Sequence, residues 1–298
     1  MRSAVAGGWG TAAGARSPRA DASCAGRRAG AAGTPRGLRR RGPGGVSVLA
    51  EARDHVPFHA PAREAAPGLF VTGTGTGVGK TVLAAAITAA LRARGVAVRV
   101  RKPVLTGLDE PCDPNWPRDH ELLAAAAGSA PEQVAPLRYG PAVSPQLAAE
   151  LTGRPIGPQQ LRSIVAASGP GFETWIIEGV GGLLVPLADD YDVRRLACDL
   201  GLPLLIAARP GLGTVNHTLL TLEAARSAGL DVAAVVLTPW PQAPTELERS
   251  NRRTIEDLGR VSVQALPTIE RAEPELLAAA GATLPLERWL WPHGAPLR

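Results

Sequence analysis

Two lysines stand out in a chain that otherwise builds its basic side chains from arginine. Lys80 and Lys102 are the only lysines among 32 Lys and Arg residues. An ammonium group is a compact point charge, and a planar guanidinium does not replace it. The use of lysine at these two positions indicates that the chemistry there needs an ammonium group. For Lys102, chance is the alternative explanation.

Lys80 ends a glycine-rich segment with the pattern of a phosphate-binding loop. Residues 69–81 read LFVTGTGTGVGKT, in which a short apolar run precedes the glycines and an Ala/Leu-rich stretch follows them. Glycines let backbone N–H groups face phosphate oxygens, and the start of the next helix adds its positive dipole end. In such a loop Lys80 reaches the β- and γ-phosphates, and the Thr81 hydroxyl ligates Mg²⁺. Five residues, one more than usual, separate Gly73 from Gly79.

Two other interpretations of this segment are weaker. A glycine-rich turn would not need the terminal Gly-Lys-Thr between a strand and a helix. A dinucleotide-binding fold should place an acidic residue at the end of the second strand. That strand ends here in Arg101-Lys102-Pro103.

Short apolar strands alternate with amphipathic helices from Gly68 onwards. This alternation predicts an α/β fold with a mostly parallel, doubly wound sheet, helices on both faces and the P-loop NTPase arrangement. We expect strands at 69–72, 97–102, 175–178, 203–208, 232–237 and 261–266. We expect helices at 80–94, 119–127, 144–151, 158–167, 192–200, 215–228, 245–258 and 274–290, with Trp289 and Trp291 docking the last one.

Charged residues follow the carboxyl ends of these strands, which is where ligands bind in parallel sheets. Lys102 ends the second strand, and Glu178 ends the strand at 175–178 and precedes Gly179, Gly181 and Gly182. Glu178 therefore resembles a Walker B acid that holds Mg²⁺, with a surface carboxylate as the alternative. Asp119 opens a helix as a second candidate acid or as a simple N-cap. His120 and Glu121 beside it are expected to be solvated.

The basic charge of the chain is concentrated at its N-terminus. Residues 1–45 hold nine Arg and one Asp, which leaves −3 of the total +5 for the other residues. We therefore expect no nucleic-acid partner. We expect residues 1–67 to be a disordered or spurious extension, or else a transit peptide, and residues 68–298 to form a single P-loop domain. Three scattered cysteines fit a reducing cytoplasm, and no apolar run predicts a membrane span.

Several motifs in order resemble the dethiobiotin synthetase family of biotin biosynthesis. They are VTGTGTGVGKT at 71–81, KPVLTG at 102–107, Asp119 before its helix, IEGVGGLLVPL at 177–187 and GLGTVNHTLLTLEA at 211–224. The resemblance implies an ATP- and Mg²⁺-dependent cyclo-ligase. In that family CO₂ adds to one amine of 7,8-diaminopelargonate as a carbamate, ATP phosphorylates the carbamate, and the second amine closes the ring to dethiobiotin, with release of ADP and phosphate. The resemblance also implies a homodimer, and it makes the single domain at 68–298 a P-loop ligase domain.

The same resemblance assigns roles to particular residues. Lys80 and Lys102 match the catalytic lysines that meet phosphate and carbamate. The implied substrate contacts are Thr76, Thr106, Gly213, Thr214 and Asn216, of which the last three belong to a helix start that receives the substrate carboxylate across the dimer interface. The implied magnesium ligands are Thr81, Asp119 and Glu178. The implied nucleotide contacts are Gly77, Val78, Gly79, Lys80, Thr81, Val82, Asp119, Glu178, Gly179, Gly181, Thr238, Pro239 and Pro267.

The sequence also departs from the family pattern. Gly75 and Gly77 stand where some members carry acids, and Thr238-Pro239-Trp240 stands where some place an Asn for adenine. Base contact through the backbone or by stacking on Trp240 is expected instead. Two alternative functions are a partition-type ATPase switch and an amidoligase that activates a cofactor side chain. The switch proteins usually carry an extra lysine early in the P-loop, and an amidoligase would need an ammonia source.

Overall fold

The computed structural model describes residues 67–114, 116–166 and 174–291. Within these residues six strands form one sheet in the order β10-β9-β8-β1-β5-β2, and all neighbouring strands are parallel. The strands are β1 (Gly68–Gly73), β2 (Val98–Arg101), β5 (Thr174–Glu178), β8 (Leu204–Ala208), β9 (Val232–Trp240) and β10 (Val263–Pro267). The predicted fold class is confirmed. The expectation for the N-terminal extension lies outside the described residues, except for Pro67.

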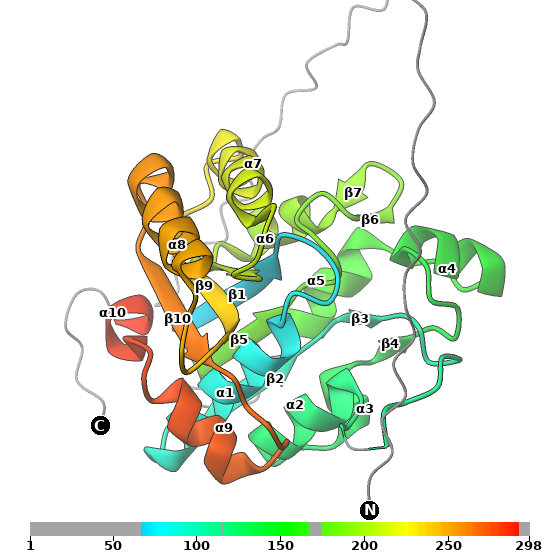
Figure 1. Cartoon of the computed structure of the whole chain (residues 1–298). Helices are drawn as coiled ribbons and strands as arrows, with labels where there is room; N and C mark the ends of the chain where they lie inside the picture. Colours follow the sequence, from blue (N-terminus) through cyan, green and yellow to red (C-terminus); the bar gives the residue numbers. More distant parts are fainter. Residues whose placement is uncertain (1–66, 115, 167–173, 292–298) are drawn as a thin grey trace, which may run out of the picture. The chain divides into compact units, whose positions relative to one another are not determined.

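Helices cover both faces of this sheet (Figure 1). One layer contains α1 (Lys80–Ala93), α2 (Asp119–Ala127), α9 (Pro274–Gly281) and α10 (Leu286–Leu290), and the other contains α5 (Pro158–Ala166), α6 (Val193–Leu200), α7 (Thr214–Ser227) and α8 (Glu246–Gly259). Side chains alternate between the two layers along each strand. In β1, Leu69 and Val71 pack into the core under α1, whereas Phe70 packs into the opposite core.

Several short elements join this framework and were not expected from the sequence. They are β3 (Val104–Leu105), α3 (Pro131–Val134), β4 (Leu137–Arg138), β6 (Pro186–Ala188) and β7 (Tyr191–Asp192), and they accompany α4 (Pro145–Thr152). β3 pairs with β4, and β6 pairs with β7. The predicted strand at 232–237 also extends to Trp240, because β9 continues to pair with β10 as far as Pro267.

The single helix expected at 274–290 is wrong. The segment forms α9 and α10, separated by residues 282–285. Pro285 has no N–H and does not fit a helix interior, so it stands at the N-cap of the second helix. Gly281 ends α9 where it crosses α1, and a Cβ there would lie 2.0 Å from the Ala86 carbonyl oxygen. Trp289, as expected, is buried at 4% exposure.

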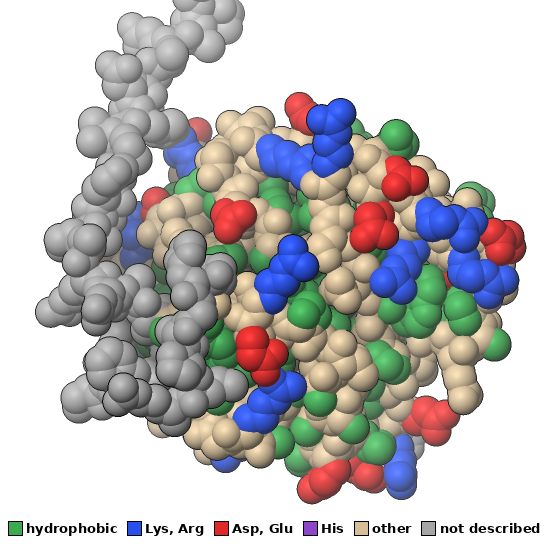
Figure 2. All heavy atoms as spheres, turned by 90° about the vertical axis from the view of Figure 1, so that its left-hand side faces the viewer, with side chains coloured by type: hydrophobic (Ala, Val, Ile, Leu, Met, Phe, Trp, Pro, Cys, Tyr) green, Lys and Arg blue, Asp and Glu red, His purple; other side chains and the backbone are tan. Residues whose placement is uncertain are grey.

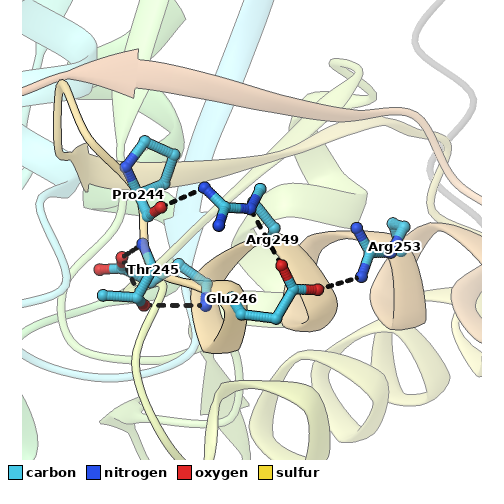
Figure 3. Close-up of polar contacts among 6 residues, drawn as sticks. Pro244, Thr245, Glu246, Arg249 and Arg253 are labelled. Carbon is cyan, nitrogen blue, oxygen red and sulfur yellow. Dashed lines mark hydrogen bonds and ion pairs between the residues drawn. The ribbon is translucent and has the colours of Figure 1, made fainter.

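The surface over α8 carries an exposed ion-pair network. Glu246 accepts hydrogen bonds from Arg249 at 3.2 Å and from Arg253 at 2.7 Å, and Arg249 also donates to the Pro244 carbonyl (Figure 3). Thr245 caps the helix. Figure 2 shows a face on which basic and acidic side chains are interspersed. No helix in the described part of the chain combines the length and the apolar character needed to cross a membrane.

Candidate active site

The register of the sheet brings the charged strand ends together. Glu178 of β5 lies opposite Val71 of β1, two residues before the P-loop begins. On the other side of β5, Ile177 lies opposite Arg101, so that Lys102 follows directly beside Glu178. These side chains are buried: Lys80 is 6% exposed, Lys102 3% and Glu178 0%.

Lys102 bridges the two candidate acids. Its Nζ lies 2.8 Å from Asp119 Oδ2 and 2.6 Å from Glu178 Oε1. The Thr81 hydroxyl donates to the same Glu178 oxygen at 2.9 Å. Asp119 is not the N-cap of α2, because Arg118 holds that position and Glu121 accepts the Arg118 N–H. The Asp119 carboxylate is thereby turned toward the site.

Burial and charge act on these groups in opposite directions. Burial alone would lower the pKa of Lys102, but the carboxylates of Glu178 and Asp119 raise it above its ordinary value. Lys102 therefore keeps its proton. Burial raises the pKa of Glu178 against the effect of Lys102, while Lys102 outweighs burial at Asp119 and lowers the pKa there. Burial lowers the pKa of Lys80 to about 8, and the charges of Glu178 and Asp119 offset this effect only in part.

The P-loop forms a tight turn ahead of α1. Gly77 and Gly79 have φ angles of 71° and 91°, in the left-handed region that favours glycine. A Cβ on Gly79 would lie 2.7 Å from the Thr238 methyl group, so β9 supports the loop from behind. Lys80 Nζ donates to the Gly75 carbonyl at 2.7 Å across the loop. The loop is thus closed by a contact between its own lysine and its own backbone.

Most of the predicted site residues line one cavity of about 640 Å³. They are Thr76, Gly77, Gly79, Lys80, Thr81, Val82, Lys102, Thr106, Asp119, Glu178 and Gly181. Sequence reasoning missed the apolar part of the wall, which comes from loops and short elements. It consists of Leu105, Trp116, Ala142, Val143, Pro145, Val180 and Val185, with Ser144 beside them.

The other predicted residues do not line this cavity. Val78 is buried behind the loop, and Gly179 packs against Phe70 and Val193. Thr238 is 2% exposed, and its side chain lies against the P-loop. Pro239 follows it in β9, and Pro267 ends β10.

The helix start that is predicted to receive the substrate carboxylate lies at the N-terminus of α7, and we call it the carboxylate turn (Gly213, Thr214 and Asn216). Gly213 is the N-cap, with a φ of 87° and no side-chain cap, and Thr214 and Asn216 lie in the first turn of the helix. The exposed Leu212, with 91% of its surface accessible, precedes them. This turn does not contribute to the lining of the cavity.

The expectation that His120 is solvated is wrong. His120 is 6% exposed, and burial lowers its pKa. The charged neighbours of His120 in the sequence suggested an exposed position. The residue is buried because α2 packs against both α1 and the unexpected α3. Glu121 is exposed, as expected.

Arg209 is a further residue that sequence reasoning did not single out. It directly follows β8, and its guanidinium donates to the Gly77 carbonyl of the P-loop. The signal was present, since Arg209 follows the carboxyl end of a strand in the same parallel sheet, as Lys102 does.

Comparison with known proteins agrees with the motifs. A family described as "AAA domain" matches residues 67–275. The chain is 43% identical over 197 residues to the ATP-dependent dethiobiotin synthetase BioD of Mycobacterium avium (strain 104), covering 65% of this chain and 84% of that protein. It is 37% identical over 225 residues to the protein of the same name from Haloferax mediterranei, covering 74% and 92%.

Solved structures align less closely. The MinC:MinD cell division protein complex of Aquifex aeolicus gives a TM-score of 0.45 at 15% identity, over 78% of this chain and 98% of that one.

Proposed function

The chain belongs to the family of ATP-dependent dethiobiotin synthetases, and on this basis we propose that it carboxylates and cyclises 7,8-diaminopelargonate to dethiobiotin with ATP and CO₂. The observation that carries the proposal is the position of Lys102. A buried ammonium, held charged by two carboxylates, lies in the same cavity as the P-loop lysine. This combination suits a reaction in which a phosphoryl group passes from ATP to an anionic carbamate and ADP leaves.

Lys80 and the backbone N–H groups of the P-loop are assigned to the phosphates. The α1 N-terminus has no acidic residue in its first turn and no side-chain cap, so its N–H groups are suited to an anion. Lys80 must exchange the Gly75 carbonyl for phosphate oxygens. Burial lowers the pKa of Lys80, and the negative charge of the bound phosphates then favours its protonated form.

Lys102 is assigned to the carbamate and to its phosphorylated form. Its ammonium supplies a preorganised positive charge in a site shielded from water, where such a charge is most effective. Thr76 and Thr106 line the same cavity and are assigned as hydrogen-bond partners of the substrate. Leu105, Val143 and Val185 offer an apolar wall that suits the hydrocarbon chain of the diamine.

The oxygen ligands beside Lys102 fit Mg²⁺. Asp119, Glu178 and the Thr81 hydroxyl lie together, and Glu178 Oε2 is buried with no hydrogen-bond partner among the described residues. Mg²⁺ is usually held by one or two carboxylates together with substrate phosphates, so a larger acidic cluster is not needed. When bound, the ion would neutralise phosphate charge during phosphoryl transfer.

Base recognition is assigned to the backbone around Thr238, Pro239 and Pro267 and to Trp240. The Thr238 side chain is buried against Gly79 and is not directed at a base. Arg252 lies 5.8 Å from the centre of the Trp240 ring and so occupies one of its faces. Stacking of a base on Trp240 would use the other face.

A homodimer would complete the substrate site. The carboxylate turn at Gly213, Thr214 and Asn216 does not line the cavity of its own protomer. Leu212, which precedes the turn, is 91% exposed, and Leu220 of α7 and Leu184 are 60% and 55% exposed. Leu184 and Leu220 line a groove with Thr74 and Thr76 of the P-loop. A second copy seated here would cover the leucines and bring its turn near the cavity, so Leu220→Glu should give a monomer in light scattering.

A cytoplasmic location is proposed as well. Cys112 and Cys198 are both exposed and form no disulfide, which suits a reducing compartment.

The test of the reaction is ADP formation with diaminopelargonate, bicarbonate and MgATP. The proposal predicts ADP release that depends on the diamine and is matched by dethiobiotin in mass spectrometry. ADP release that is indifferent to the diamine would instead indicate the switch-type ATPase.

A further inference from the structure

Arg209 hydrogen-bonds to the P-loop from outside the cavity. Its Nε and Nη2 both donate to the Gly77 carbonyl oxygen, at 3.0 Å and 2.7 Å. Arg209 is exposed and is not among the residues that line the cavity. It therefore contacts the loop without occupying the space that phosphates would fill.

The turn that carries Arg209 is itself held in place. Asn251 of α8 donates through Nδ2 to the carbonyls of Pro210 and Gly211, at 2.9 Å and 3.1 Å. Arg209 also directly follows β8, which pairs with β1 up to Ala207 opposite Gly73. A strand end and a helix side chain thus fix the base of the arginine.

The P-loop needs such support because of its composition. Gly75, Gly77 and Gly79 leave the loop with more backbone freedom than other residues would, and ordering it on ligand binding costs entropy. The two cations at the loop each hold one carbonyl: Lys80 holds Gly75, and Arg209 holds Gly77. Lys80 must leave its carbonyl to reach phosphate, whereas Arg209 can stay in place when the nucleotide binds.

We propose that Arg209 is a positioning residue that preorganises the P-loop for the nucleotide. It turns the Gly77 carbonyl outward and so leaves the loop N–H groups facing the phosphates. The inference rests on nucleotide binding at the P-loop and deepens the proposed function. It predicts an effect on nucleotide affinity, not on the chemical step.

The experiment measures ADP binding by calorimetry for Arg209→Gln and Arg209→Lys. We expect Arg209→Gln to weaken ADP binding about tenfold, the size of one hydrogen bond to a charged group. KM for ATP should rise by a similar factor, with kcat within about twofold of the starting protein. Arg209→Lys keeps the charge and one donor, so it should restore part of the affinity.

A matched control is available on the same protein. Arg226 is also exposed and also donates to backbone carbonyls, at 2.6 Å to Gly259 and 3.2 Å to Arg260. It lies in the last turn of α7, at the end of that helix opposite to the one that follows Arg209. Arg226→Gln should leave ADP affinity and KM unchanged. Amide hydrogen exchange over residues 73–81, without nucleotide, should become faster in Arg209→Gln only.

Two results would overturn the inference. If Arg209→Gln changed neither the ADP affinity nor the hydrogen exchange of residues 73–81, Arg209 would not order the P-loop. A fall in kcat with KM unchanged would place the guanidinium on the transferring phosphoryl group instead of on the loop. ADP binding needs no diamine, so a failed ligase assay would leave this test intact.

Discussion

Two charge networks in this protein share a pattern and differ in environment. At the cavity, one cation, Lys102, is shared by Asp119 and Glu178. On α8, one anion, Glu246, is shared by Arg249 and Arg253. The Lys102 and Glu178 side chains are 4% and 0% exposed, whereas the Glu246 side chain is 70% exposed.

The difference determines what each network contributes. Exposed ion pairs are solvated and screened by salt, and most of them contribute little to stability. A buried pair carries a large desolvation cost, and removing one partner leaves the other charge without compensation. The buried network is therefore weak evidence for stability but a strong indication of function, because it keeps charged groups poised in a shielded cavity.

The largest effect is expected at Lys102. Lys102→Arg should lower kcat about 100-fold or more, the range found when one preorganised electrostatic contact is lost. A guanidinium is bulkier and spreads its charge, whereas the site offers a compact position between two carboxylates. ADP affinity, measured by calorimetry, should be nearly unchanged because the P-loop is intact. Kinetics close to those of the starting protein would remove Lys102 from the catalytic set.

Glu178→Gln should come next. The amide keeps the shape of the side chain but removes a charge that the proposed Mg²⁺ site needs. The Mg²⁺ concentration for half-maximal activity should rise about tenfold. A titration of activity with Mg²⁺ at fixed ATP concentration measures this value. An unchanged Mg²⁺ requirement would mean that Glu178 does not contact the ion directly or through water.

Asp119→Asn should give a smaller change of the same kind. The Asp119 side chain is 46% exposed, so water can partly replace what the carboxylate supplies. We expect a shift in the Mg²⁺ requirement of about threefold, following the weaker electrostatics of exposed sites. A shift larger than that of Glu178→Gln would reverse the order that burial predicts.

Glu246→Gln should have the smallest effect. The Glu246 side chain is 70% exposed, so its loss leaves no buried charge without a partner. Thermal unfolding and steady-state kinetics should match those of the starting protein. A clear loss of thermal stability would show that the contrast between the two networks is misplaced.

The sequence predicted the parts of this site that local pattern and sheet rules govern. The P-loop spacing located Lys80 and Thr81, and the rule that ligands lie at strand ends located Lys102 and Glu178 at one edge. Both signals depend on residues close in sequence or on the parallel direction of the strands. The P-loop fold class followed from the same signals.

Other parts could not be predicted because they depend on packing between distant elements. Trp116 and Val143 reach the cavity from loops whose paths follow from the pairing of β3 with β4. The break between α9 and α10 follows from the contact of Gly281 with Ala86, which no local period reveals. His120 was misplaced for the same reason, since α3 was not foreseen.

The most direct test of the central claim, that Lys102 holds the carbamate, is ¹³C NMR with labelled bicarbonate and the diamine in the absence of hydrolysable ATP. The account predicts a protein-bound carbamate signal in the unmodified protein and in Glu246→Gln, and its loss in Lys102→Met. A carbamate signal of equal strength in Lys102→Met would contradict it.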